Sequence, residues 1–594
     1  MSYLPSLTEA ATSRMMTETF YGYDHRLKAA DGTWFEETGL SSRAFPLFAP
    51  RVRRAKLHLD CDSVPDKMIC KEKLAWAGKD RRIYYDAERV FGMELTEGDK
   101  QLVSMGAYLC VFPDGVYVNT ADKTDKGYMG NRVEFHGNVT LTMCSADGER
   151  YDKDGEPAVA SIAPTNPNNG DYWIDTSDDN HVLKRYSASQ GQWVTFTTVY
   201  VKIEARGIGK GFREQDGVTI SGIHKYDETS ALFKQIEALN SDMIIQKVDE
   251  NYIIVVGLLD RTISFDVDKL VVERKVPEMD FVCELDNRLW GCHYGYTNGK
   301  YVNTIYACAQ GDPRNWFRYA GISTDSYAVN VGSDGKFTGM CAYGGYVLAF
   351  KERCIHKIYG TLPSNFSVST SQCRGVAEGS SESLAIANEV LYYLTRTGVV
   401  AYDGSTPQSV FDAFAGDQYS DGRAGVMGSE YYICMRDKML KDQVWCYDTS
   451  KGIWHHVLDE DVKQFVPVGS DLVALMPNGD VWSMNGEGNG DGYEDPVEFD
   501  AVSGIIGYEY PDHKYISRFV MRLKMNHDDE LEVLVRYDSH GDWESQGVVK
   551  MAATNSFTLP VIPRRCDHMQ IRLRGKGDIR IFSIAKVLEV GSDA

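Results

Sequence analysis

The chain has 594 residues, a formal net charge of −22 and 13 cysteines. The length exceeds what a single hydrophobic core usually supports and predicts roughly two to four domains. The acidic surplus argues against general phosphate binding, which needs clustered Lys and Arg, but it is compatible with a duct that repels DNA. The odd number of cysteines, most of them inside strand patterns, predicts free thiols rather than a disulfide framework.

Neither a signal peptide nor a membrane span is expected from the sequence. The N-terminal residues lack the basic and apolar regions of a signal peptide, and no stretch approaches 18 apolar residues. We therefore expect the chain to fold in a reducing cytoplasm.

Residues 1–60 are predicted to form an N-terminal arm. Ser6 and Glu9 have the spacing of a capping box on a short helix. The remainder is rich in turns and contains aromatic residues that need a partner surface. That surface is either the propeller that the following segments predict or a neighbouring subunit.

A short hairpin pattern then recurs in residues 61–135 and again in residues 273–488. Each copy has an alternating apolar strand, a turn containing Gly or Asp, and a second strand that ends in an aromatic residue. Two examples are "SMGAYLCVFPDGVYVN" from Ser104 and "PVGSDLVALMPNGDVWSMNG" from Pro467. Repeated hairpins of this kind are typical of β-propeller blades. The sequence therefore predicts an all-β fold with a split propeller of about six to eight blades.

Residues 136–272 interrupt the hairpin pattern and are predicted to be an inserted β-rich module. The strands "DYWID", "VLKRY" and "WVTF" form a small meander that is expected to place its aromatic residues on one face. A helical segment, "SALFKQIEALN", and a continuous apolar strand, "NYIIVVGLL", follow.

Residues 489–594 are predicted to be a linker followed by a β-sandwich. The linker segment "NGEGNGDGYEDP", from Asn485 to Pro496, is rich in Gly and acidic residues and has almost nothing to bury. Six alternating strands follow it, which is the pattern of a small antiparallel sandwich.

No motif indicates a catalytic residue, a metal ligand or a cofactor. The segment "GIGKGF" lacks the spacing of a P-loop, and "DGERYDKDGE" fails the spacing of a calcium loop. His455 and His456 are adjacent, so in a strand they point to opposite faces and cannot readily share one metal ion. Carboxylates are plentiful and none is singled out, so a glycosidase pair stays open.

Two groups of residues are candidates for contacts with partners. The aromatic side chains of the inserted module either pack between strands or offer a platform on which sugars stack; they are Tyr172, Trp173, Tyr186 and Trp193. A basic cluster in the arm either contacts protein or binds nucleic acid, and we expect it to contact a neighbouring subunit; it comprises Arg51, Arg53 and Arg54.

Several segments, in the same order along the chain, resemble phage tail proteins described as stabilisation, hub or nozzle proteins. They include "YVNTIYACAQGDPRNWFRY" from Tyr301, "VLAFKERCIHKIYGTLPSNFSV" from Val347 and "PVIPRRCDHMQIRLRGKGDIRIFSI" from Pro560. The arm also resembles the usual start of these proteins. The resemblance implies a homomeric ring, often sixfold, that closes or extends the tail below the portal and adaptor. The insertion departs from the family's pattern, which leaves its partner undefined.

The resulting hypothesis is a structural virion protein of the tail, assembled in the host cytoplasm, without enzymatic activity or cofactor. Its expected partners are further copies of itself, portal, adaptor or other tail proteins, tail fibres, and genomic DNA that passes without sequence-specific binding. The alternative is a receptor- or glycan-binding propeller, that is, an adhesin. A third interpretation, a glycan hydrolase, requires paired carboxylates about 5 to 9 Å apart in a cleft.

Overall fold

The computed structural model describes residues 11–26, 30–90, 92, 94–151, 157–178, 180–224, 231–297, 299–487, 492–507, 513–550, 555–559 and 564–590. Within these ranges the chain forms 49 strands, one α-helix and two short 3-10 helices, so the predicted all-β class is confirmed. All 13 cysteines are free, as expected. None of the described helices is long and apolar enough to cross a membrane.

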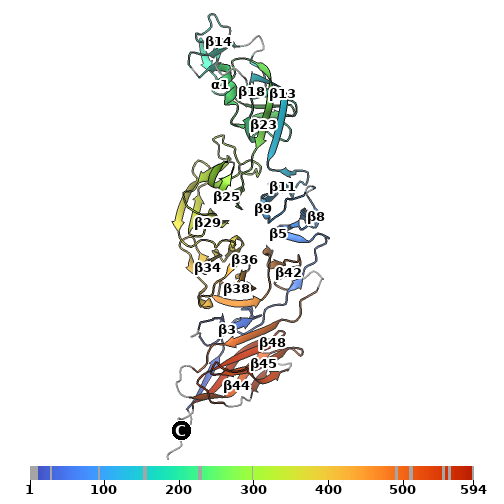
Figure 1. The fold of residues 1–594 in the computed structure, drawn as a ribbon, viewed down its shortest axis with the longest axis vertical. Helices are drawn as coiled ribbons and strands as arrows, with labels where there is room; N and C mark the ends of the chain where they lie inside the picture. Colours follow the sequence, from blue (N-terminus) through green and yellow to red (C-terminus); the bar gives the residue numbers. More distant parts are fainter. Residues whose placement is uncertain are drawn as a thin grey trace, which may run out of the picture.

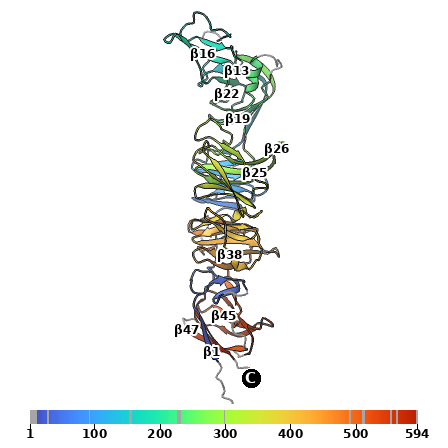
Figure 2. The same cartoon turned by 90° about the vertical axis from the view of Figure 1, so that its left-hand side faces the viewer.

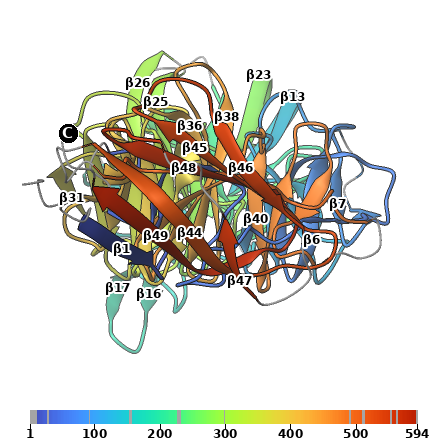
Figure 3. The same ribbon diagram turned by 90° about the horizontal axis from the view of Figure 1, so that it is seen from below.

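The molecule is a column of three β-structured units (Figure 1, Figure 2). The insertion occupies one end, a ring of sheets the middle, and a sandwich the other end. Figure 3 views the column from the sandwich end, where the long strands of that unit cross in front of the ring.

The middle unit is built from seven four-stranded antiparallel sheets within the described residues. We number these ring sheets one to seven in chain order. The strands of ring sheets one to four are β5 (Pro65–Lys71), β6 (Lys73–Gly78), β7 (Ile83–Tyr85), β8 (Glu88–Arg89), β9 (Gln101–Met105), β10 (Tyr108–Phe112), β11 (Val116–Asn119), β12 (Lys126–Tyr128), β24 (Phe281–Leu285), β25 (Arg288–Thr297), β26 (Lys300–Ala307), β27 (Tyr327–Asn330), β28 (Gly339–Tyr343), β29 (Tyr346–Lys351), β30 (Cys354–Tyr359) and β31 (Ser367–Gln372).

The remaining three sheets continue the same meander, except that the outer strand of the seventh, β4, comes from near the start of the chain. Their strands are β32 (Ala385–Ala387), β33 (Val390–Thr395), β34 (Gly398–Tyr402), β35 (Gln408–Ser409), β36 (Ser420–Met427), β37 (Glu430–Arg436), β38 (Asp442–Asp448), β39 (Ile453–Leu458), β40 (Gln464–Val468), β41 (Asp471–Leu475), β42 (Val481–Ser483) and β4 (Ala55–Lys56). The 3-10 helices η1 (Ser381–Ser383) and η2 (Asp412–Phe414) lie in the connections on either side of ring sheet five.

Apolar side chains fill the space between each pair of consecutive ring sheets. Successive residues of a strand point to opposite faces of its sheet, so each sheet contributes side chains to the space on both of its sides. The circle closes between the seventh sheet and the first, where Val466 and Val473 pack with Met68 and Trp76. This closed arrangement of small sheets is that of a β-propeller, as predicted from the hairpin repeats.

One strand of the ring comes from a distant part of the chain. In ring sheet seven, β4 supplies the outer strand, with Ala55 opposite Ser483 and Lys56 opposite Trp482. Since β4 lies in residues 1–60, this part of the expected arm is instead an integral strand of the ring.

Other residues of the expected arm form strands of the sandwich. One sheet has the order β1 (Ala11–Thr17), β49 (Arg580–Val590), β44 (Lys514–Lys524) and β47 (Asn555–Leu559). The other has the order β2 (Gly22–Tyr23), β3 (Thr33–Thr38), β43 (Glu498–Ser503), β48 (Met569–Lys576), β45 (Glu530–Tyr537) and β46 (Glu544–Val549).

The aromatic residues of the arm were expected to pack on the propeller or on a neighbouring subunit, but most of the buried ones lie in the core of the sandwich, and Tyr23 packs on the ring. Phe20, Trp34 and Phe48 are buried between the two sheets, together with Phe499 and Phe519. The capping box of Ser6 and Glu9 lies outside the described residues.

The insertion leaves the ring between its second and third sheets through two long paired strands, β13 (Asn131–Cys144) and β23 (Ile263–Arg274). The predicted limits, 136 and 272, fall inside these strands. They join a seven-stranded sheet with β18 (Tyr200–Glu204), β19 (Gly217–Ser221), β20 (Asp242–Ile244), β21 (Lys247–Asp249) and β22 (Tyr252–Val256). Helix α1 (Ala231–Ala238) contributes Ile236 to the core of this unit.

Candidate functional site

The aromatic candidates lie on a small sheet at the far end of the insertion. Its strands are β14 (Ala158–Ala160), β15 (Tyr172–Asp175), β16 (Val182–Ser187) and β17 (Gln192–Thr195). Trp193 meets Trp173 and Tyr186 edge to face, with both pairs of ring centroids 5.4 Å apart. The Lys184 ammonium lies 5.0 Å from the centroid of the Trp173 ring.

Tyr172 does not belong to this aromatic face. Neighbouring residues in a strand point to opposite sides, so Tyr172 faces away from Trp173 and packs with Tyr151 and Phe196. The expectation that all four aromatic residues share a face is thus wrong for Tyr172.

Trp173 is buried and donates its indole N–H to the carbonyl of Ala160 at 2.9 Å. Tyr186 and Trp193, which are half-buried, are the aromatic candidates with surface left for a ligand.

The basic candidates converge on one residue of the same chain, Glu494. Arg51 and Arg54 both form ion pairs with Glu494, and the Arg54 guanidinium reaches Glu460 on its other side at 2.9 Å. Arg53 stays exposed and donates to the main-chain carbonyl of Glu494. Arg54 is buried, so it cannot contact a neighbouring subunit as expected; Arg53 retains an accessible side chain.

Glu494 holds this group together from within the predicted linker. Burial acts to raise the pKa of the Glu494 carboxyl, but the hydrogen bonds and charges of Arg51 and Arg54 outweigh it and lower the pKa below its ordinary value. The linker was expected to bury almost nothing, yet Glu494 joins it to the ring. Within that linker, residues 488–491 lie outside the described part of the chain.

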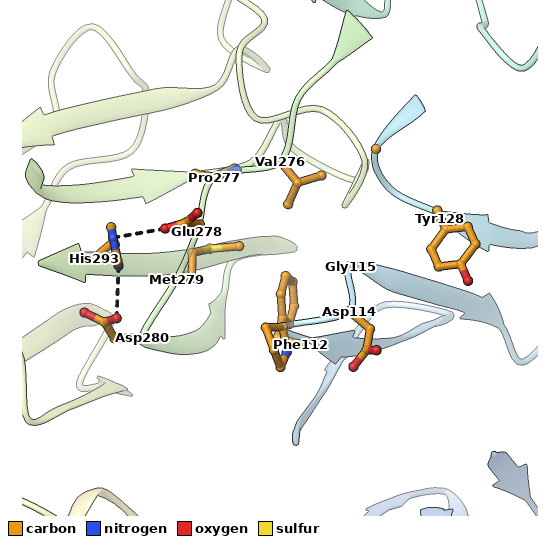
Figure 4. Close-up of a pocket in the computed structure, with 12 residues that line it drawn as sticks. Phe112, Asp114, Gly115, Tyr128, Val276, Pro277, Glu278, Met279, Asp280 and His293 are labelled. Carbon is orange, nitrogen blue, oxygen red and sulfur yellow. Dashed lines mark hydrogen bonds and ion pairs between the residues drawn. The ribbon is translucent and has the colours of Figure 1, made fainter. Parts of the chain in front are cut away.

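A cavity of about 550 Å³ lies where the insertion joins the ring (Figure 4). Phe112 and Asp114 line it from ring sheet two, and Glu278 and Asp280 line it from the segment that returns from the insertion. His293 of β25 stands between the last two carboxylates.

The geometry of His293 bears on the hydrolase hypothesis. Its Nδ1 lies 3.0 Å from an Asp280 carboxylate oxygen, and its Nε2 lies 3.5 Å from a Glu278 oxygen. Hydrolysis by a carboxylate pair needs the glycosidic bond between the two acids. Here an imidazole ring occupies that space, so the pair does not have the geometry of a glycosidase site.

The two adjacent histidines join the sandwich to the ring. His455 Nδ1 lies 2.9 Å from a carboxylate oxygen of Glu37 in β3, and the His456 backbone N–H donates to the same oxygen at 3.2 Å. All three residues are buried. They connect two units of the column rather than forming a metal site.

One group of potential metal ligands occurs among the described residues, namely Cys434, Asp442 and Asp461. Arg423 already pairs with both carboxylates, at 3.2 Å and 2.7 Å. Burial raises the pKa of the Cys434 thiol to about 11, so the thiol is protonated at neutral pH and is a poor ligand. The arrangement is an ion-pair network.

No protein-family model and no curated protein matches the chain. Several solved structures are distantly similar. The exo-beta-1,3-galactanase of Phanerochaete chrysosporium is 8% identical, with 50% of this chain and 94% of that chain covered and a TM-score of 0.21. PorZ of the Porphyromonas gingivalis type-IX secretion system is 12% identical, with 88% and 76% covered and a TM-score of 0.24. U3-55K is 8% identical, with 53% and 91% covered and a TM-score of 0.23. At these values, the likenesses carry no argument about function.

Proposed function

We propose that the chain is a structural subunit of a phage tail, in which copies of it form a homomeric ring that retains and then conducts genomic DNA. The observation that carries the proposal is the attachment of the two outer units to opposite rims of the propeller (Figure 1). The insertion leaves between the second and third ring sheets, whereas the sandwich is held at the sixth by Glu37, His455 and His456.

A propeller that carries one unit on each of two opposite rims acts as a rigid spacer between these units. Its stiffness comes from the closed circle of apolar contacts between sheets, and from β4, which fastens the seventh sheet. We read each ring sheet as one blade, which gives a seven-bladed propeller. Such a strut is suited to the wall of a duct, and this role needs no catalytic residue.

Charge supports the passage of DNA through such a duct. The chain carries 85 acidic and 63 basic residues, so a lumen lined by its copies repels the phosphate backbone. In this proposal the partners are further copies of the chain, portal, adaptor or other tail proteins, and tail fibres. The protein assembles in the host cytoplasm and resides in the virion tail.

The test is to measure the mass and symmetry of the purified chain, alone and with virion extracts, by sedimentation and electron microscopy. The expected result is a closed ring whose mass is a whole multiple of 66.6 kDa, six in the preferred case, and the presence of the chain in virions. A chain that stays monomeric at every concentration and is absent from virions would falsify the proposal.

A second candidate function, glycan binding, is favoured by one observation. Tyr186 and Trp193 are half-buried and belong to the small sheet of β14 to β17. Figure 1 places β14 of this sheet at the end of the column that is far from the sandwich. Stacking on a sugar would need the rings of Tyr186 and Trp193. Replacing Trp193 with Ala should abolish glycan-array binding, whereas Trp543→Ala in the sandwich should preserve it. An array without any binding by the wild-type chain removes this candidate.

A further inference from the structure

Strand β31 is an open edge on the outer rim of ring sheet four. It is six residues long, carries no charge and no Pro, and pairs with β30 without a register shift from Ser367 to Gln372. Five of its six side chains are exposed. A long, flat edge of this kind is a template for another strand, and proteins normally shorten, charge, bend or cover it.

The other six ring sheets do protect their outer strands. In five of them the described outer strand has two to four residues; these strands are β4, β8, β12, β27 and β35. In the sixth sheet, β39 also has six residues, but β2 and β3 of the sandwich contact it. Among the described outer strands of the ring, β31 alone is both long and uncovered.

The hydrogen-bond pattern shows which backbone groups of β31 face outward. The N–H of Cys373 donates to the carbonyl of Arg353 at 3.2 Å, so this pair is of the hydrogen-bonded type. Because the two types alternate along an antiparallel pair, the N–H and C=O groups of Val368, Thr370 and Gln372 point away from β30. These groups can receive an added strand.

The surroundings of this edge are basic, although the whole chain is strongly acidic. The four strands of ring sheet four contain two lysines and no Asp or Glu. Lys351 is buried, but Lys357 lies opposite Ser369 of β31, with its ammonium 3.7 Å from the centroid of the exposed Tyr346 ring. Lys357 therefore offers a cation and an aromatic surface beside the edge.

Two arginines add charge at the end of β31. Arg353 and Arg374 are both exposed, and Arg374 donates to the hydroxyl of Thr397 at 3.2 Å. The carboxylates close to them in sequence are occupied elsewhere, since Glu352 pairs with Arg396 and Glu378 pairs with Lys336. Neither arginine forms an ion pair within the described part of the chain.

We propose that the β31 edge is a docking site for an extended, acidic segment of another protein, which adds as a fifth strand to ring sheet four. Main-chain hydrogen bonds to Val368, Thr370 and Gln372 would supply affinity, and Lys357, Arg353 and Arg374 would select acidic side chains. This proposal does not depend on the ring proposed above, since a monomer presents the same edge.

The test uses the full chain and two labelled nine-residue peptides, one alternating Thr and Glu and one alternating Thr and Lys. Binding is measured by fluorescence anisotropy, and hydrogen exchange is followed in the segment 366–374. The acidic peptide should bind and slow exchange in this segment, while the basic peptide should do neither. Added salt should weaken binding, because exposed charges contribute.

Two variants separate backbone pairing from general surface effects. Gln372→Pro removes one outward N–H without touching the bonds to β30, and should weaken binding about fivefold to tenfold. Gln372→Ala keeps the N–H and is the matched control. Lys357→Glu should weaken binding several-fold and allow the basic peptide to bind.

Three outcomes would overturn the proposal. The first is equal binding of the two peptides, and the second is equal binding of the acidic peptide by the Gln372→Pro variant and the wild type. The third is protection of segment 366–374 without peptide that rises with protein concentration and disappears in Gln372→Pro, which would assign the edge to a second copy of this chain.

Discussion

The Arg54 Nε atom lies 2.9 Å from a carboxylate oxygen of Glu494, although 440 positions separate the two residues. This contact joins the entry of the chain into the ring to its exit toward the sandwich. Arg51 shares the same carboxylate. Two of the three arginines that the sequence suggested as a subunit contact, Arg51 and Arg54, therefore stabilise the chain's own junction.

Replacing Glu494 with Gln should destabilise this junction. The change leaves the buried Arg54 and the largely buried Arg51 without their shared charge, at a cost of about 2–3 kcal/mol. Calorimetry should show the loss as a lower temperature of the first unfolding transition. An unchanged transition would mean that Glu460 alone satisfies Arg54.

The contribution of Glu494 should also depend on pH. Its pKa is lowered in the folded state, so the stabilisation is fully present above pH 4.5, its ordinary value, and is lost as the pH falls through the lowered pKa. The wild type should therefore lose its advantage over Glu494→Gln on acidification. A stability difference that stays constant from pH 6 to pH 3 would contradict the ion-pair explanation.

His356 should make ring sheet four sensitive to acid. Burial, followed by the nearby Lys351 charge, lowers the pKa of this imidazole to about 4, while Ser333 and Thr370 bond to its two nitrogens. The unfolded chain binds a proton near pH 6.5, so stability falls between about pH 6.5 and pH 4, by up to about 3 kcal/mol.

The His356→Asn variant should show a flatter dependence of unfolding temperature on pH over this range. His527→Asn is the matched control, because His527 is exposed on the sandwich. If both variants follow the wild-type curve, His356 is not the source of acid sensitivity.

Gly425 should tolerate no side chain, because it lies where ring sheet six meets ring sheet seven. A Cβ atom there would come within 2.6 Å of side-chain atoms of Leu472 and Phe465. Gly425→Ala should therefore cost about 1–3 kcal/mol by forcing the two sheets apart. Gly332→Ala, where a Cβ meets nothing within 4 Å, should leave the unfolding temperature unchanged.

Arg53 and Arg54 should respond differently to charge reversal. Arg54→Glu places a carboxylate beside Glu494 and Glu460 and should lower stability strongly. Arg53→Glu should leave stability nearly unchanged, since its side chain is exposed, but it should reduce ring assembly if Arg53 contacts a neighbouring subunit. Sedimentation of both variants separates the two effects; normal assembly of Arg53→Glu removes this residue as a subunit contact.

The repeated hairpins were predictable because alternating apolar residues and Gly turns are local signals. Strand β4 was not, since its two residues, Ala55 and Lys56, have no pattern and are strands only because β42 needs a partner. The role of Glu494 was hidden for a similar reason, as a single acid in a Gly-rich segment looks solvated. The side on which Tyr172 lies was derivable from strand alternation.

The aromatic residues of the candidate site show the same limit of prediction from sequence. From the sequence, Trp173 and Trp193 were equivalent candidates that either pack between strands or offer a platform for sugars, but burial depends on which strand covers each ring. Only the structure reveals that Trp173 donates to Ala160 and is buried. The open edge of β31 had a visible signal, an uncharged "SVSTSQ" strand, whose meaning emerged once the outer strands of the other sheets were seen to be short or covered.

Strand β4 has a consequence for the time course of synthesis. The outer strand of ring sheet seven leaves the ribosome more than 400 residues before β42, its partner, and β1 waits still longer for β49. The insertion, in contrast, contains all the strands of its own seven-stranded sheet and can fold while the rest is being made. During translation the early strands thus remain without their partners. The nascent chain depends on these segments being kept from aggregating until its last hundred residues emerge.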